Sequence, residues 1–131
     1  MDNKSYENND MDYKSIVRLQ ASVTVNSKDW EAFKQKLTAV KIIVQSEGVN
    51  VLTHETYCQS GGFNCMIIEG YVNEKAFLNH LENIKPLDEK YKVDWKVNRL
   101  ELSGAFSEQT VNEFRKANKG IEFAFYGDSI F

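Results

Sequence analysis

The chain has 131 residues, of which 42% are hydrophobic and 27% are charged, and its formal net charge is −3 at pH 7. This length and balance are typical of one globular domain with a single hydrophobic core. No cluster of Lys and Arg provides the positive surface that nucleic-acid binding needs. No apolar run reaches the roughly 20 residues that cross a bilayer, and the first residues lack the apolar segment of a secretory signal. We therefore expect a cytoplasmic protein with no nucleic-acid or membrane partner.

Residues 1–14 form the first segment and are rich in Asn, Asp and Lys. They offer only Tyr6, Met11 and Tyr13 for burial, which is too little to hold a segment in a folded structure. We predict a flexible acidic tail over residues 1–14 and a single domain over residues 15–131.

The first regular elements are a strand and a helix. Apolar residues alternate with polar ones over residues 16–25, which is the period of a half-buried strand. Asn26 or Ser27 can then cap a helix that ends before Gly48. Its apolar residues recur at three- and four-residue spacing: Trp30, Phe33, Leu37, Val40 and Val44.

A hairpin and a second helix follow. Strands are predicted over residues 49–59 and 63–72, joined by Ser60-Gly61-Gly62, because glycines supply the positive φ of a tight turn. Asn73 caps a helix whose apolar face consists of Ala76, Phe77, His80, Leu81 and Ile84. Pro86 is expected to break or restart that helix, since proline has no N–H to donate. We expect a polar continuation of this helix as far as Lys92.

In the last third of the chain we predict a strand, a short helix and a final strand. In the strand over residues 93–106 the apolar residues change from odd to even positions, which indicates a bulge near Asn98 or Arg99. Ser107 caps the short helix, and the final strand covers residues 121–126.

The main order is strand, helix, strand, strand, helix, strand. This order predicts an α+β fold of the ferredoxin-like kind, a four-stranded antiparallel sheet with both helices on one face. The strand over residues 63–72 also carries Met66, Ile68 and Val72 on its other side. We therefore expect a homodimer in which two sheets stack face to face. The alternative is that the final strand and the short helix cover that face within one chain.

The hairpin turn fixes which residues oppose one another. With Gly61 and Gly62 at its centre, opposed positions sum to 123, so that His54 faces Glu69. The other expected pairs are Cys58 with Cys65, Thr56 with Ile67, and Leu52 with Tyr71. A carboxylate beside an imidazole can fix its tautomer and raise its basicity, which makes the first pair a candidate acid–base pair. Equally, such a pair can be a satisfied polar contact with no chemical role.

His80 on the second helix could point at the same space. We predict a pocket with His54, Glu69 and His80 as catalytic residues. Its substrate-binding residues are expected to be Tyr71, Trp30 and Trp95, the two tryptophans as walls. Packing is the alternative role for His80 and Tyr71.

Other site types have little support in the sequence. Two opposed cysteines can form a disulfide, but in a reducing cytoplasm we expect Cys58 and Cys65 to be small apolar side chains. The His and Cys residues lack the spacing of a zinc site, so no metal is expected. No glycine-rich loop is present to hold the phosphates of a nucleotide or flavin, and we expect no cofactor.

The segment HETYCQSGGFNCMIIEGYVNEKAFLNHL, from His54 to Leu81, resembles the signature of antibiotic biosynthesis monooxygenase-like (ABM) dimeric α+β barrel proteins. In that family a strand ending in Glu-x-Trp or Glu-x-Tyr leads into a helix with an Ala and then a His. The matching residues here are Glu69, Tyr71, Ala76, Phe77 and His80. The resemblance covers residues 16–131 and implies a dimeric barrel. Asn83-Ile84-Lys85-Pro86 stands where many members have a second His or aromatic cluster, which argues against the haem-degrading branch.

The resemblance implies a cofactor-independent monooxygenase that acts on a small aromatic or quinol-type substrate. His54 would be the base, Glu69 its orienting partner, and Tyr71 or His80 would hold the developing oxyanion. The alternatives are a non-catalytic or stress-related barrel that binds a small apolar ligand, and a purely structural interaction module.

Overall fold

The computed structural model describes residues 13–130, so the predicted tail over residues 1–14 lies almost entirely outside the described residues. The strands are β1 (Val17–Val25), β2 (Val51–Cys58), β3 (Asn64–Tyr71), β4 (Trp95–Gly104) and β5 (Glu122–Tyr126). The helices are α2 (Trp30–Glu47), α3 (Glu74–Lys90) and α4 (Glu108–Ala117). Single turns of 3-10 helix lie at Tyr13–Ser15, Ser27–Asp29 and Gly48–Asn50. No helix among residues 13–130 has both the length and the hydrophobicity needed to cross a membrane.

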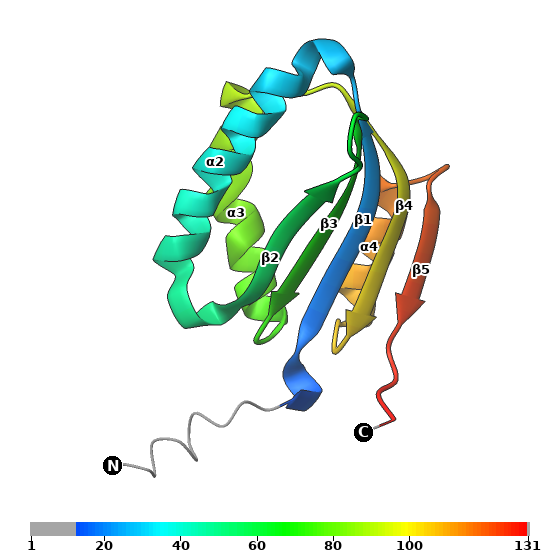
Figure 1. Ribbon diagram of the computed structural model, residues 1–131. Coiled ribbons are helices and arrows are strands. Elements are labelled where there is room, and N and C mark those ends of the chain that lie inside the picture. The colour runs from blue at the N-terminus through cyan, green and yellow to red at the C-terminus, as the bar shows by residue number, and fades with distance from the viewer. Residues whose placement is uncertain (1–12, 131) are drawn as a thin grey trace.

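All five strands form one sheet, in the order β2-β3-β1-β4-β5 (Figure 1). β1 pairs antiparallel with β3 and β4, and β2 pairs antiparallel with β3. These four strands are the predicted ferredoxin-like unit. β5 pairs with β4 in parallel, so the complete sheet has five strands and is mixed.

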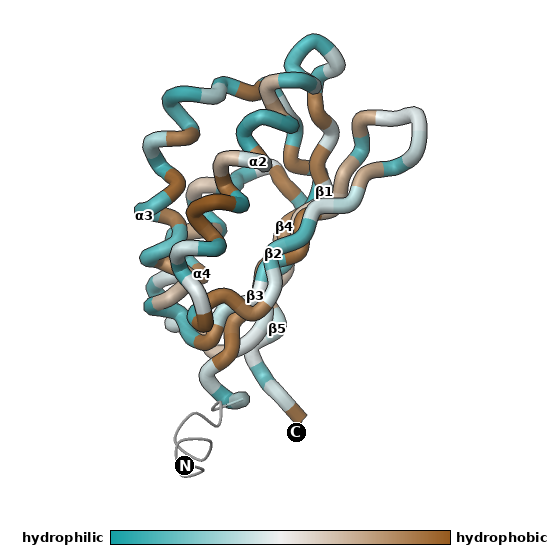
Figure 2. Tube along the Cα trace, turned by 60° about the vertical axis from the view of Figure 1, so that its left-hand side comes forward, coloured by the Kyte–Doolittle hydropathy of each residue, from teal (hydrophilic) through white to brown (hydrophobic). Residues whose placement is uncertain are grey.

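The three helices lie on the same side of the sheet, as the rotated view shows (Figure 2). In the core beneath them, Val111 of α4 packs in one cluster with Phe77 of α3 and Leu102 of β4. The expectation that α4 could cover the second face of the sheet is therefore wrong, because its apolar residues join the core that α3 already covers. β5 extends the sheet at its edge. Within residues 13–130, no helix covers the second face.

α3 runs through Pro86 without a break and ends at Lys90, which corrects the expected restart and the continuation to Lys92. Proline at this position removes the bond from residue 86 to the carbonyl group of Glu82. Both residues lie on the exposed side of the helix, where water can bind the freed carbonyl. The apolar residues on the other side hold the helix to the sheet.

Two bulges adjust the strands. Ser22 pairs with Arg99 whereas the next residue of β1, Val23, pairs with Val97, so Asn98 is the extra residue and the predicted bulge is confirmed. The second bulge was not predicted. Tyr71 pairs with Val51 rather than with Leu52, which is the extra residue of β2.

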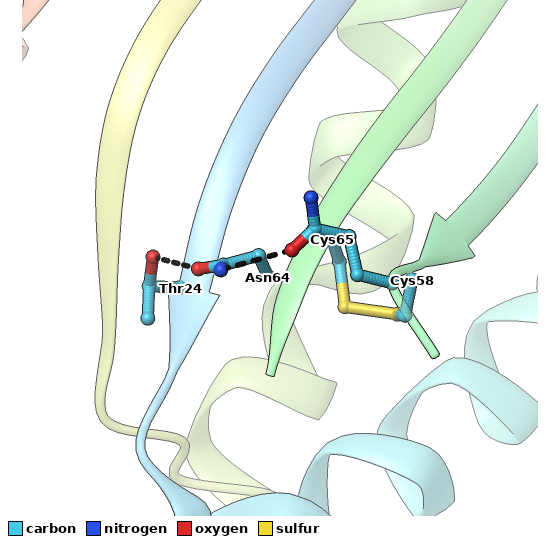
Figure 3. The surroundings of a disulfide bond; sticks show 5 residues. Thr24, Cys58, Asn64 and Cys65 are labelled. Carbon is cyan, nitrogen blue, oxygen red and sulfur yellow. Dashed lines mark hydrogen bonds between the residues drawn. A yellow bond between two sulfur atoms is a disulfide. The ribbon is translucent and has the colours of Figure 1, made fainter. Parts of the chain in front are cut away.

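Cys58 and Cys65 form a disulfide between β2 and β3, which corrects the expectation of two free thiols (Figure 3). The two residues are directly opposed, and their Cα atoms are 4.0 Å apart. The expectation was wrong because it assumed a reducing cytoplasm, although the predicted strand register already placed Cys58 opposite Cys65. On the adjoining residue Asn64, the side-chain oxygen accepts a hydrogen bond of 2.7 Å from Thr24 of β1.

Gly104 ends β4 in a conformation that only glycine adopts readily. Its φ is +100°, and a Cβ atom at this position would collide with the backbone carbonyl group of Ile16. The close approach lets the chain turn from β4 towards α4 while remaining beside the start of β1.

Candidate functional site

The candidate site lies on the helix-facing side of β2 and β3. His54 and Glu69 are directly opposed, as the turn-based register predicted. The His54 Nε2 and Glu69 Oε2 atoms are 3.6 Å apart, and both side chains are largely buried. This separation is an ion-pair distance if the imidazole is protonated, and is too long for a hydrogen bond. Glu69 is therefore placed to stabilise a proton on His54 without holding its ring.

Glu69 is itself held by Tyr71, two residues further along β3. The Tyr71 hydroxyl group donates a hydrogen bond of 2.6 Å to Glu69 Oε1. Burial raises the pKa of Tyr71, and the charge and the hydrogen bond of the Glu69 carboxylate raise this pKa further. Tyr71 thus remains a neutral phenol that fixes the position of Glu69.

His80 reaches the same place from α3. Its side chain is 1% exposed, and its ring lies 5.0 Å from that of His54 and 5.4 Å from that of Tyr71, centroid to centroid. His80 Nδ1 is 2.8 Å from Glu47 Oε1. His80 Nε2 is buried and has no hydrogen-bond partner among the described residues.

Glu47 belongs to this cluster and was missed by the sequence analysis. It is the last residue of α2, and its second carboxylate oxygen accepts a hydrogen bond of 2.9 Å from Asn83 of α3. The sequence did offer one indication of its role. The helix dipole disfavours a carboxylate at the C-terminus of a helix, so a Glu in that position suggests a specific partner.

Burial favours the neutral form of His54. Burial lowers the pKa of His54 below its usual 6.5, and the nearby His80 lowers it further, while Glu69 and Glu47 oppose the shift. A neutral imidazole offers one ring nitrogen as an acceptor, which is the form that a base requires.

Two hollows meet at His54. A cavity of about 90 Å³ lies between α2, α3 and the sheet, and its lining includes His54, Glu69, Phe33, Ile84 and Trp95. A groove of about 450 Å³ lies between α2 and β2, and its lining includes Leu37, Lys41, Val44, Thr53 and His54. His54 is therefore reachable from a space with the volume of a small-molecule site.

The two tryptophans differ in position. Trp95 lines the smaller cavity, as predicted for a wall. Trp30 packs against Phe33 and Phe63, at ring-centroid distances of 5.4 and 5.3 Å, and is not among the residues that line either hollow. The structure thus brings together His54, Glu69, Tyr71 and His80, with Trp95 at the cavity and Trp30 apart.

Comparisons with known proteins support the fold. No family model matches the chain, and no curated protein matches its sequence. Among solved structures, MupZ from Pseudomonas fluorescens is similar with a TM-score of 0.67 and 18% identity, over 89% of this chain and 93% of MupZ.

Two proposed antibiotic biosynthesis monooxygenases have similar structures. The protein from Bacteroides thetaiotaomicron gives a TM-score of 0.54 at 21% identity, over 72% of this chain and 90% of that protein. The protein from Caulobacter crescentus gives 0.53 at 10% identity, over 77% and 99%. The chain therefore has the α+β fold of these proteins, which confirms the resemblance at the level of fold.

Proposed function

We propose that the protein is a monooxygenase that needs no cofactor and acts on a small phenol or quinol, with His54 as the base. The observation that carries this proposal is the position of His54. It is a neutral, largely buried imidazole that borders both the groove and the apolar cavity and faces the Glu69 carboxylate. The shared fold with proposed monooxygenases supports the reaction class.

The chemistry begins with proton transfer. His54 Nε2 accepts the proton of the substrate hydroxyl group, and the resulting imidazolium is stabilised by Glu69 Oε2 at 3.6 Å. The phenolate is electron-rich enough to react with O₂ at a ring carbon, in a space from which water is excluded. That carbon loses its hydrogen and gains one oxygen atom as a carbonyl group. The other oxygen atom leaves as water with the ring hydrogen and the phenolic hydrogen, so phenol and O₂ give quinone and water.

The other residues support this base. Tyr71 holds Glu69 in place, and Trp95 with Phe33 and Ile84 forms the apolar wall of the cavity. The Tyr71 hydroxyl group has one proton and donates it to Glu69, so it is not free to donate a hydrogen bond to a substrate oxyanion. We assign Tyr71 to positioning.

We also propose that the protein works as a homodimer through the second face of the sheet. Tyr57 and Met66 are 59% and 38% exposed on this face, in the part of the chain that the structure describes. Arg18 of β1 and Glu55 of β2 lie on the same face, so two copies related by a two-fold axis can pair opposite charges.

The test is oxygen uptake by the purified protein with a panel of naphthols, anthrones and hydroquinones in the presence of a chelator. We expect His54→Gln to lower the rate by at least about 100-fold, the usual contribution of a general base. Glu82→Gln, an exposed change on α3, is the matched control and should keep the wild-type rate.

Two results would contradict the proposal. One is an unchanged rate in a folded His54→Gln variant. The other is aromatic ligands that raise the melting temperature of the wild-type protein while no oxygen is consumed and no product forms, which would favour the ligand-binding alternative.

A further inference from the structure

Three side chains of the site have the geometry of a metal-binding set. His54, Glu69 and His80 each offer one ligand atom, and the three atoms lie within 4.8 Å of one another. Ligand atoms around a tetrahedral zinc ion lie about 3.4 Å apart, given Zn–N distances of about 2.0 to 2.1 Å. The separation of 3.6 Å between His54 Nε2 and Glu69 Oε2 is close to that value.

The second observation is the unpartnered nitrogen of His80. The Glu47 carboxylate accepts a hydrogen bond from Nδ1, so in the neutral ring the lone pair is on Nε2. Nε2 is buried without a hydrogen-bond partner among the described residues. A buried acceptor that makes no hydrogen bond destabilises the folded state, so its presence calls for an explanation. A metal ion would supply the missing partner.

The supporting contacts also match a metal site. A histidine that binds a metal usually donates its other ring N–H to a carboxylate, which fixes the ring and raises its basicity. Glu47 does this for His80, and Asn83 holds Glu47 in turn. Glu69 is likewise held by the Tyr71 hydroxyl group. Each of these two ligands therefore has a partner that fixes its orientation.

Charge is the fourth observation. Glu47 and Glu69 are two largely buried carboxylates, and their ion pairs within residues 13–130 are with His80 and His54 alone. No Lys or Arg in this part of the chain pairs with either. A divalent cation at this site would offset the charge of the two carboxylates.

We propose that His54, Glu69 and His80 bind one divalent transition-metal ion of the zinc type. Two imidazoles and one carboxylate are a ligand set for Zn²⁺ or its first-row neighbours, and are a poor set for Ca²⁺ and Mg²⁺, which prefer oxygen ligands. Three protein ligands leave a fourth position, on the side where His54 and Glu69 line the cavity.

This inference goes beyond the proposed function and does not rest on it. A metal ion on His54 Nε2 takes the lone pair that the base needs, so metal and substrate proton compete for one atom. The metal-loaded protein should be inactive as a cofactor-independent oxygenase, and a chelator should restore its activity.

The test is titration of the chelator-treated full chain with Zn²⁺ by calorimetry, and with Co²⁺ by visible absorption. We expect one ion per chain and the intense d–d bands of a four-coordinate cobalt site. His54→Gln, Glu69→Gln and His80→Gln should each abolish binding at micromolar metal. Glu47→Gln should weaken binding about 10- to 100-fold, as expected for a residue that positions a ligand.

Two controls exclude other modes of binding. Cys58→Ser/Cys65→Ser should bind like the wild type, which rules out thiolate ligands, and Glu82→Gln should also be unchanged. Circular dichroism establishes that each variant is folded. The proposal is overturned if the wild-type protein binds no Zn²⁺ or Co²⁺ at 100-fold excess over chain, or if folded His54→Gln and His80→Gln variants both keep wild-type affinity. Oxygen uptake in chelator is measured separately, so failure of either proposal leaves the other testable.

Discussion

His80 of α3 is hydrogen-bonded to Glu47 at the end of α2, with 2.8 Å between Nδ1 and Oε1, although 33 residues separate them in the chain. The contact joins α2 to α3 and fixes the orientation of a fully buried imidazole. It therefore contributes to stability and to the site at once.

Glu47→Gln should destabilise the protein by about 1–2 kcal/mol, because a charged acceptor of a buried hydrogen bond becomes neutral. The measurement is urea-induced unfolding near pH 7.5. Glu31→Gln is the matched control, since Glu31 pairs with Lys34 on the exposed side of α2, and its effect should stay below about 0.5 kcal/mol. Equal effects of the two changes would mean that the contact with His80 adds nothing.

The pKa shift of His54 predicts how stability depends on pH. Its pKa in the folded protein lies below the usual 6.5, mainly because of burial. As the pH falls below 6.5, the unfolded chain takes up a proton before the folded protein does, so unfolding becomes more favourable. Stability contributed by neutral His54 is thus complete above pH 6.5 and is lost as pH falls through the folded pKa.

The free energy of unfolding, measured in chelator between pH 8 and pH 5, should fall more steeply for the wild type than for His54→Gln. Parallel curves for the two proteins would show that His54 titrates normally in the folded state.

Gly104→Ala should destabilise the protein by at least about 3 kcal/mol, because a positive φ and a collision with the backbone of Ile16 act together. Gly120→Ala tests the first factor alone. Gly120 has a φ of +84° and open space around it, so its substitution should cost about 1 kcal/mol. Thermal or urea unfolding of both variants checks the ratio, and similar losses would rule out the steric effect.

Met66→Arg should convert the proposed dimer into a monomer, because it places a charge on the second face of the sheet, where Met66 is 38% exposed. Light scattering at micromolar concentration measures the mass. Ile42→Arg is the control, since Ile42 is 64% exposed on α2, on the side of the molecule that carries the helices. A wild-type protein that is already monomeric would refute the dimer.

Local patterns were enough to predict most of the fold. Alternation identified β1, and the glycines at 61 and 62 set the register that brings His54 opposite Glu69. The change of parity in β4 located the bulge at Asn98. These features depend on residues close together in sequence or on one turn.

Features that depend on packing between distant elements were not predictable in the same way. The contact of Glu47 with His80 depends on how α2 lies against α3, which no periodicity encodes. The bulge at Leu52 shifts the pairing of β2 with β3 at the end far from the turn, so the turn residues did not predict that Tyr71 pairs with Val51. Pro86 was expected to break α3. The helix continues because Pro86 lies on its exposed side, where water can bind the backbone carbonyl group that loses its helical hydrogen bond.

The bulge at Leu52 also affects how the protein can associate with other chains. β2 is an outer strand of the sheet, and an outer strand with regular unpaired N–H and C=O groups is a template for aggregation. An extra residue interrupts that row and twists the strand locally. The bulge thereby makes this edge of the sheet a poorer template for pairing with strands of other chains.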